Sequence, residues 1–141
     1  MEHRLLSEKL STERLDGEVI AIDFVTGRYF SFEGPGADVI HLLSNSVPRA
    51  QWREIFVESY EMVPDKNKWE REIDSFLQEL NKNSLIAPVS SLTTSSTGLP
   101  NDVVREVWTS PTFMVNDELV DLLVIDPIHE SGDRGWPQGQ S

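Results

Sequence analysis

The stretch Gly17–Phe32, GEVIAIDFVTGRYFSF, decides the fold class. Its first half, residues 17–24, is rich in β-branched and apolar residues, and residues 28–32 are rich in aromatic ones, which is typical of strands. The connection Val25-Thr26-Gly27 is short, and its glycine can adopt a positive φ. The stretch therefore predicts a β-hairpin. A further strand is expected over residues 9–15, joined to the hairpin by a turn at Asp16-Gly17.

Two amphipathic helices are expected next. The first covers residues 35–43, and its apolar set is Val39, Ile40, Leu42 and Leu43. Ser46 can cap the second helix, with Pro48 near its first turn. The apolar residues of this second helix fall at i, i+3, i+4 and i+8 on one face: Trp52, Ile55, Phe56 and Tyr60.

The third helix shows the clearest amphipathic pattern. Either Asp65 or Asn67 can cap its start, and Asn83 is a plausible left-handed residue at its end. Its apolar stripe is Trp69, Ile73, Phe76, Leu77 and Leu80. A short apolar segment, Leu85-Ile86-Ala87, follows.

The expected order is thus three strands followed by three helices. A three-stranded antiparallel sheet cannot bury its apolar face alone, and three amphipathic helices can cover it. The sequence predicts an α+β winged helix-turn-helix domain over residues 8–88.

Composition restricts the partners of the chain. Its 141 residues carry 24 acidic and 12 basic side chains, a net charge of -12. Such a charge repels phosphate backbones and anionic membranes, so neither nucleic acid nor a membrane is an expected partner. No stretch approaches the length of a membrane span, and the charged residues 1–11 do not form a signal peptide. We expect a cytoplasmic protein.

The sequence offers no catalytic or metal site. It has no cysteine, which excludes disulfides, thiolate zinc sites and cysteine nucleophiles. His3, His41 and His129 have no metal-ligand spacing, and the local group Asp126, His129 and Glu130 reads as a solvated turn. No phosphate-binding loop or activated nucleophile is present. We expect a protein that is not an enzyme and needs no cofactor.

Several of these residues together resemble the PqqD family. They are Asp16-Gly17-Glu18-Val19, Thr26 to Phe32, Gly36-Ala37 at a helix start, and Phe76-Leu77-x-x-Leu80 before Leu85-Ile86. The family often has Gly where this chain has Asn83-Ser84, and Leu-Asn where it has Phe32-Glu33. The resemblance covers residues 8–88. It implies a recognition element that captures the leader of a ribosomally made precursor peptide and presents it to a modifying enzyme.

The resemblance implies binding by strand addition. An edge strand exposes unpaired backbone groups with which an extended peptide can pair. The candidate edge is Arg28 to Phe32 and the candidate wall is the third helix, and the face of the edge strand that meets the peptide stays open. The candidate peptide-binding residues are Arg28, Tyr29, Phe30, Ser31, Phe32, Lys66, Trp69, Glu70, Ile73 and Leu77. For each apolar one, a place in the core is the alternative.

Residues 89–100 read as a flexible linker because residues 90–98 are mainly small and polar. The tail that follows, residues 101–141, is acidic. Its segment Trp108-Thr109-Ser110-Pro111-Thr112-Phe113 is similar to the Tyr-x-x-Pro-x-Leu element of lasso-peptide leaders. Trp108, Pro111 and Phe113 would be the anchors of a tethered, leader-like ligand.

This tail suggests that the chain carries its own ligand. It could fill the groove of its own chain or that of a second copy in a swapped dimer. In the strongest form of this hypothesis, the end of the tail is a substrate for a partner enzyme. The alternative is a partly disordered acidic tail with a short helix after Asn116 that ends before Pro127.

Two other classes of function remain open. A winged helix can bind DNA, and the third helix does carry Lys66, Lys68, Arg71 and Lys82, but Glu70, Glu72, Asp74 and Glu79 offset them. A structural scaffold subunit is the other alternative.

Overall fold

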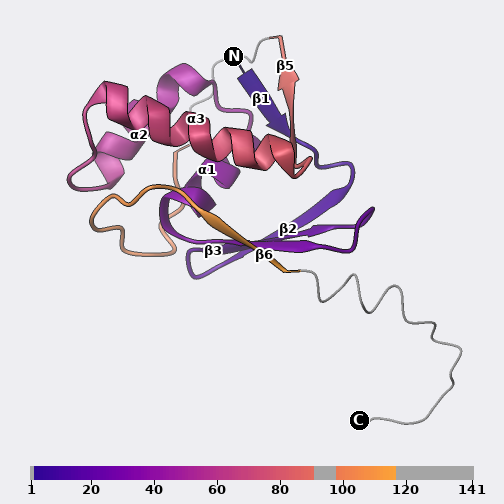
Figure 1. Ribbon diagram of the computed structural model, residues 1–141. Helices are drawn as coiled ribbons and strands as arrows, with labels where there is room; N and C mark the ends of the chain where they lie inside the picture. Colours follow the sequence, from indigo (N-terminus) through magenta and orange to yellow (C-terminus); the bar gives the residue numbers. More distant parts are fainter. Residues whose placement is uncertain (1, 91–97, 117–141) are drawn as a thin grey trace, which may run out of the picture.

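The computed structural model describes residues 2–90 and 98–116 (Figure 1). Four strands come first: β1 (Glu2–Leu5), β2 (Leu10–Leu15), β3 (Glu18–Asp23) and β4 (Tyr29–Phe32). Three helices follow: α1 (Gly34–Ser44), α2 (Arg49–Ser59) and α3 (Lys66–Lys82). Two further strands, β5 (Ile86–Val89) and β6 (Phe113–Asn116), come after the helices. Among these residues no helix has the length and apolar character needed to cross a membrane.

The main sheet has four antiparallel strands in the order β2-β3-β4-β6. The α+β class and the three predicted strands are therefore confirmed, but the predicted three-stranded sheet is wrong, because residues 113–116 add a fourth strand, β6. The helices lie on one side of this sheet (Figure 1).

A second sheet extends the folded part of the chain beyond the predicted boundary at residue 8. Strand β1 pairs with β5 from Glu2↔Val89 to Leu5↔Ile86. Leu5 and Ile86 are both buried. Charged side chains interrupt residues 1–11 at positions 2, 4, 8 and 9, and the strand was missed because Leu5 is its only fully buried residue.

The predicted turns of the main sheet are present. Asp16 and Gly17 both have positive φ values, 52° and 85°, as expected for a two-residue hairpin turn. Gly27 has a φ of 78°, and its N–H donates to the carbonyl of Asp23. These turns fix the register of β2, β3 and β4.

The helix ends decide which residue caps α3 and correct the predictions for the start of α2 and the end of α3. Asp65 caps α3, since its carboxylate accepts from the N–H of Lys68 at 3.1 Å. Ser46 does not cap α2, because it has a φ of 55° and the helix begins only after Pro48. The left-handed residue after α3 is Ser84 rather than Asn83. The N–H of Leu85 donates to the carbonyl of Leu80, which completes a Schellman motif.

The core lies between the helices and the inner face of the main sheet. Its central side chains are fully buried, among them Phe32, Phe56, Trp69, Ile73 and Leu80. The stripe predicted on α3 is buried along its whole length.

We expect Ile73→Ala to lower the free energy of unfolding by about 2–5 kcal/mol, because it removes a fully buried side chain and leaves a cavity. Urea unfolding followed by circular dichroism measures this. Leu15→Ala is the matched control, because Leu15 is 74% exposed, and it should change the stability by less than about 0.5 kcal/mol. Equal effects of the two changes would contradict the assignment of Ile73 to the core.

Candidate functional site

Residues 98–116, here called the tethered segment, lie against the folded domain. The segment runs past the helices and ends as β6 beside β4 (Figure 1). The antiparallel register runs from Phe32↔Phe113 to Tyr29↔Asn116. The backbone of β4, which would otherwise be a sheet edge on this side, is therefore paired along its whole length.

An aromatic cluster holds the start of β6. The ring of Phe113 lies 5.5 Å from that of Phe32, 6.0 Å from that of Phe30 and 5.9 Å from that of Phe76, measured between centroids. Pro111 is also buried. Beside them a cavity of about 340 Å³ separates the segment from α3, and it is lined in part by Ser75, Glu79 and Asn83. Phe113 therefore wedges between the sheet and one flank of α3.

Trp108 is the second aromatic anchor. It is 7% exposed, and its ring meets those of Phe56 and Tyr60 edge to face at 5.1 and 5.7 Å. Its indole N–H donates to Glu72 at 2.8 Å. Two backbone bonds frame it: the N–H of Glu61 donates to the carbonyl of Glu106, and the N–H of Trp108 donates to the carbonyl of Glu61. Both side-chain and main-chain contacts thus hold this part of the segment.

Gly36 in α1 allows the segment to approach the helix closely. A Cβ at this position would lie 2.6 Å from the carbonyl oxygen of Thr112, much closer than van der Waals contact permits. Glycine in a helix costs about 1 kcal/mol relative to alanine. The gain is a close contact between the helix and the backbone of the segment.

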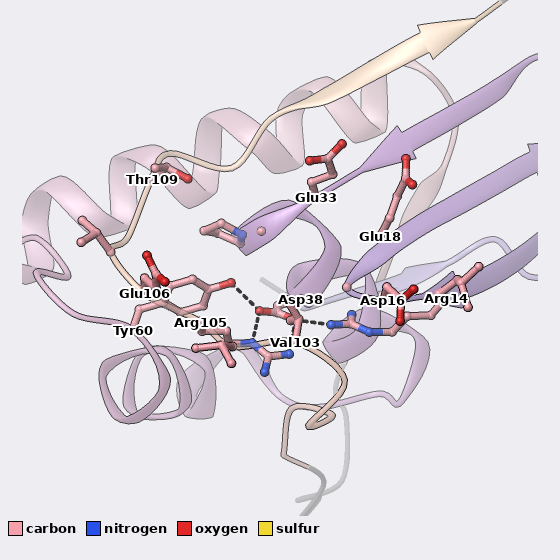
Figure 2. Close-up of a pocket in the computed structure, with 16 residues that line it drawn as sticks. Arg14, Asp16, Glu18, Glu33, Asp38, Tyr60, Val103, Arg105, Glu106 and Thr109 are labelled. Atoms are coloured by element: carbon pink, nitrogen blue, oxygen red, sulfur yellow. Dashed lines mark hydrogen bonds and ion pairs between the residues drawn. The ribbon is translucent and has the colours of Figure 1, made fainter.

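A buried group of charges binds the first part of the segment (Figure 2). Asp38 of α1 is 1% exposed and accepts from Arg105 through Nε at 2.7 Å and Nη2 at 2.9 Å. It also accepts from Arg14 at 3.1 Å and from the hydroxyl of Tyr60 at 2.6 Å. Asp102 of the segment accepts from Arg14 at 2.7 Å and from the backbone N–H of Gly17 at 3.0 Å.

The ionisation of this group follows from its contacts. The hydrogen bond to Asp38 raises the pKa of Arg105. Burial, and then the hydrogen bond to Asp38, raise the pKa of Tyr60. The hydrogen bond from Arg14 lowers the pKa of Asp102 to about 2. Arg105 and Asp102 are thus charged at neutral pH, and the hydroxyl of Tyr60 remains a donor.

The structure brings the predicted edge strand and the predicted ligand together. Phe30 and Phe32 face the core and contact Phe113, while Tyr29 and Ser31 lie half-buried on the other face. Ser31 donates to Glu18. Arg28 precedes β4, and its carbonyl accepts from the N–H of Asp23. The inner face of β4 is therefore the one that meets the anchor.

The predicted wall residues of α3 lie elsewhere. Trp69 and Ile73 are core residues, and Trp69 reaches the segment only through Phe56, whose ring contacts Trp108. Glu70 bonds to Arg49, and Leu77 lines a cavity with His3 and Arg49. Lys66 is exposed in the first turn. The contacts of α3 with the segment come from Glu72 and Phe76, while Ser75, Glu79 and the C-cap residue Asn83 line the cavity beside it.

Sequence reasoning missed the domain residues that contact the segment before β6, which include Arg14, Gly36, Asp38, Tyr60, Glu61 and Glu72. One signal was available. Asp38 interrupts the apolar surroundings of Ala37, Val39 and Ile40, and a carboxylate buried in a helix needs a partner. In the segment, Trp108 and Pro111 are three residues apart, and Arg105 and Asp102 precede them at the same spacing.

Part of the predicted tail lies outside the described residues. Asn116 is the last residue of β6, and the helix that it was predicted to cap begins beyond it. The short helix expected after it, the group at Asp126, His129 and Glu130, and most of the predicted linker fall on residues that are not described. In residues 2–90 and 98–116 no group of three or more His, Asp or Glu side chains is placed to hold a metal ion.

Comparisons of the chain with family models, with curated proteins and with solved structures gave no match. The function is therefore inferred from the site itself.

The Asp102–Arg14 pair makes a pH-dependent contribution to stability. Because folding lowers the pKa of Asp102 from 3.8 to about 2, its contribution is full above about pH 4 and is lost as the pH falls toward 2. The difference in unfolding free energy between the native chain and Asp102→Asn should narrow over that range, as measured by urea unfolding. Glu106→Gln changes an exposed carboxylate of the same segment. Its difference in unfolding free energy from the native chain should change less over this pH range. A constant difference for Asp102→Asn would contradict the pairing.

Proposed function

We propose that this protein is a peptide-recognition element that binds extended peptides by strand addition at β4, and that the tethered segment is a ligand that it carries itself. In this proposal the external ligand is the leader of a ribosomally made precursor peptide, which the domain presents to a modifying enzyme. The domain would then be a PqqD-like winged helix with no catalytic role of its own.

One observation carries the proposal: β6 pairs with β4 although the 23 residues 90–112 separate it from β5 along the chain. A strand that joins a sheet edge from so far away uses the same contacts that a separate peptide would use. Backbone pairing supplies binding with little sequence demand, and the pockets for Phe113 and Trp108 supply anchors.

The composition favours a peptide over DNA as the ligand. The net charge of -12 opposes phosphate binding. On α3 one basic side chain pairs with its own helix, since Lys82 lies 3.6 Å from Glu79. The flank of α3 beside the segment presents Glu72 and Glu79, which suits main-chain and indole N–H donors rather than phosphate.

The proposal is tested on the full chain with its own ligand weakened. The open-groove variant carries Asp102→Asn, Arg105→Ala, Trp108→Ala and Phe113→Ala, and circular dichroism checks its fold. A fluorescent peptide with the sequence of residues 98–116 is then titrated against it. We expect saturable binding, with backbone amide shifts in β4, and binding to the native chain at least tenfold weaker because the tether holds its own segment at a high effective concentration.

Absence of binding to a folded open-groove variant would overturn the proposal, because the segment would then be an integral strand and not a ligand. Binding without amide shifts in β4 would overturn strand addition as the mode of binding.

Gly36→Ala should release the tethered segment without harming the domain. The added Cβ collides with the carbonyl of Thr112, whereas alanine favours helix α1. Amide hydrogen exchange should speed up at least tenfold in Phe113–Asn116 and stay unchanged in β2 and β3. Gly98→Ala is the matched control, since a Cβ at that position of the segment meets open space. Unchanged exchange in β6 of Gly36→Ala would contradict the close approach.

A further inference from the structure

We infer that Asp38 and Arg14 form a specificity site that selects peptides carrying an acidic residue and an arginine three residues apart, upstream of the aromatic anchors. This inference rests on the proposed function and names the class of peptide that the groove accepts. In the tethered segment the pattern reads Asp102-x-x-Arg105-x-x-Trp108-x-x-Pro111-x-Phe113.

The charges of the site match those of the segment one to one. The domain contributes Asp38 and Arg14, which bond to each other at 3.1 Å. The segment contributes Arg105, which takes Asp38 as its partner, and Asp102, which takes Arg14. The result is a closed group of two acids and two bases. A peptide without the arginine would cover Asp38 with one base fewer, and a buried charge that loses a partner is costly.

The geometry is specific for a guanidinium group. Arg105 uses Nε and Nη2 together on the two oxygens of Asp38, a two-pronged contact that lysine cannot make. The side chain of Arg105 is only 8% exposed, so water replaces little of this contact. The hydroxyl of Tyr60 holds the same carboxylate from another side, which fixes its orientation (Figure 2).

The backbone contacts set the spacing at which this arginine is read. The carbonyl of Glu106 and the N–H of Trp108 both bond to Glu61, which places Arg105 just before that bridge. Farther along, the pairing of Phe113 with Phe32 fixes the other end of the segment. An arginine shifted by one residue along the peptide would therefore miss Asp38.

A cavity of about 480 Å³ opens beside Arg105, and its lining includes more acidic than basic side chains, among them Asp16, Glu18 and Glu33 (Figure 2). Their negative potential favours a basic side chain of a peptide at this end of the groove. The charge of the surroundings thus agrees with the selection of arginine by Asp38.

The test uses the open-groove variant and synthetic peptides of residues 98–116. We expect the Arg105→Gln peptide to bind at least about thirtyfold more weakly than the native peptide, and the Arg105→Lys peptide to lie between them. The Val104→Ala peptide is the matched control, because Val104 is 83% exposed, and it should bind within about twofold of the native peptide. Fluorescence anisotropy measures all four affinities.

A second variant separates recognition from a purely structural effect. Asp38→Asn in the open-groove variant should bind the native and Arg105→Gln peptides with affinities within about threefold of each other, because the carboxylate that discriminates them is gone. If this substitution unfolds the domain, the peptide series alone decides.

The failure of the arginine site and the failure of peptide binding give different results. If the native and Arg105→Gln peptides bind the open-groove variant equally well, the arginine site is wrong while peptide binding stands. If neither binds, the proposed function itself fails.

Discussion

The edge that β4 would expose without β6 is the constraint on which the rest of the structure depends. A strand at the edge of a sheet exposes donors and acceptors that must be paired, covered or protected by charge. Here β6 pairs with them, and its anchor Phe113 completes an aromatic cluster begun by Phe30, Phe32 and Phe76. Gly36 lets the backbone that leads into this strand approach α1 closely, and polar side chains of α3 line the cavity beside it.

Three anchors of the tethered segment, Asp102, Arg105 and Trp108, contact different elements of the domain. Asp102, Arg105, Trp108 and Pro111 follow one another at three-residue intervals, which in an extended chain is a step of about 10 Å. Asp102 reaches Arg14 of β2, Arg105 reaches α1, and Trp108 reaches α2 and α3. A single extended segment thus contacts most of the domain, and its docking reports on the arrangement of all these elements together.

Local patterns predicted the elements well and their assembly less well. The hairpin, the turns at Asp16-Gly17 and Gly27, the cap at Asp65 and the stripe on α3 follow from residues close together in the sequence. Strand β1 and the place of β6 depend on partners far away in the chain, which periodicity does not reveal. The wall of the groove was assigned to Lys66, Trp69, Glu70, Ile73 and Leu77. Trp69 and Ile73 fill the core, and the contacts of α3 with the segment come from Glu72 and Phe76.

The two kinds of contact in this groove serve different ends. Backbone pairing and aromatic burial favour binding of almost any extended peptide with suitable anchors. The charged group around Asp38 adds little net affinity, because removing Asp38, Arg105 and most of Arg14 from water offsets much of their attraction. Its effect is to disfavour a peptide that lacks the arginine. Such a peptide would leave the buried carboxylate of Asp38 without its bidentate partner. A groove built in this way separates how tightly a peptide is held from which peptide is accepted.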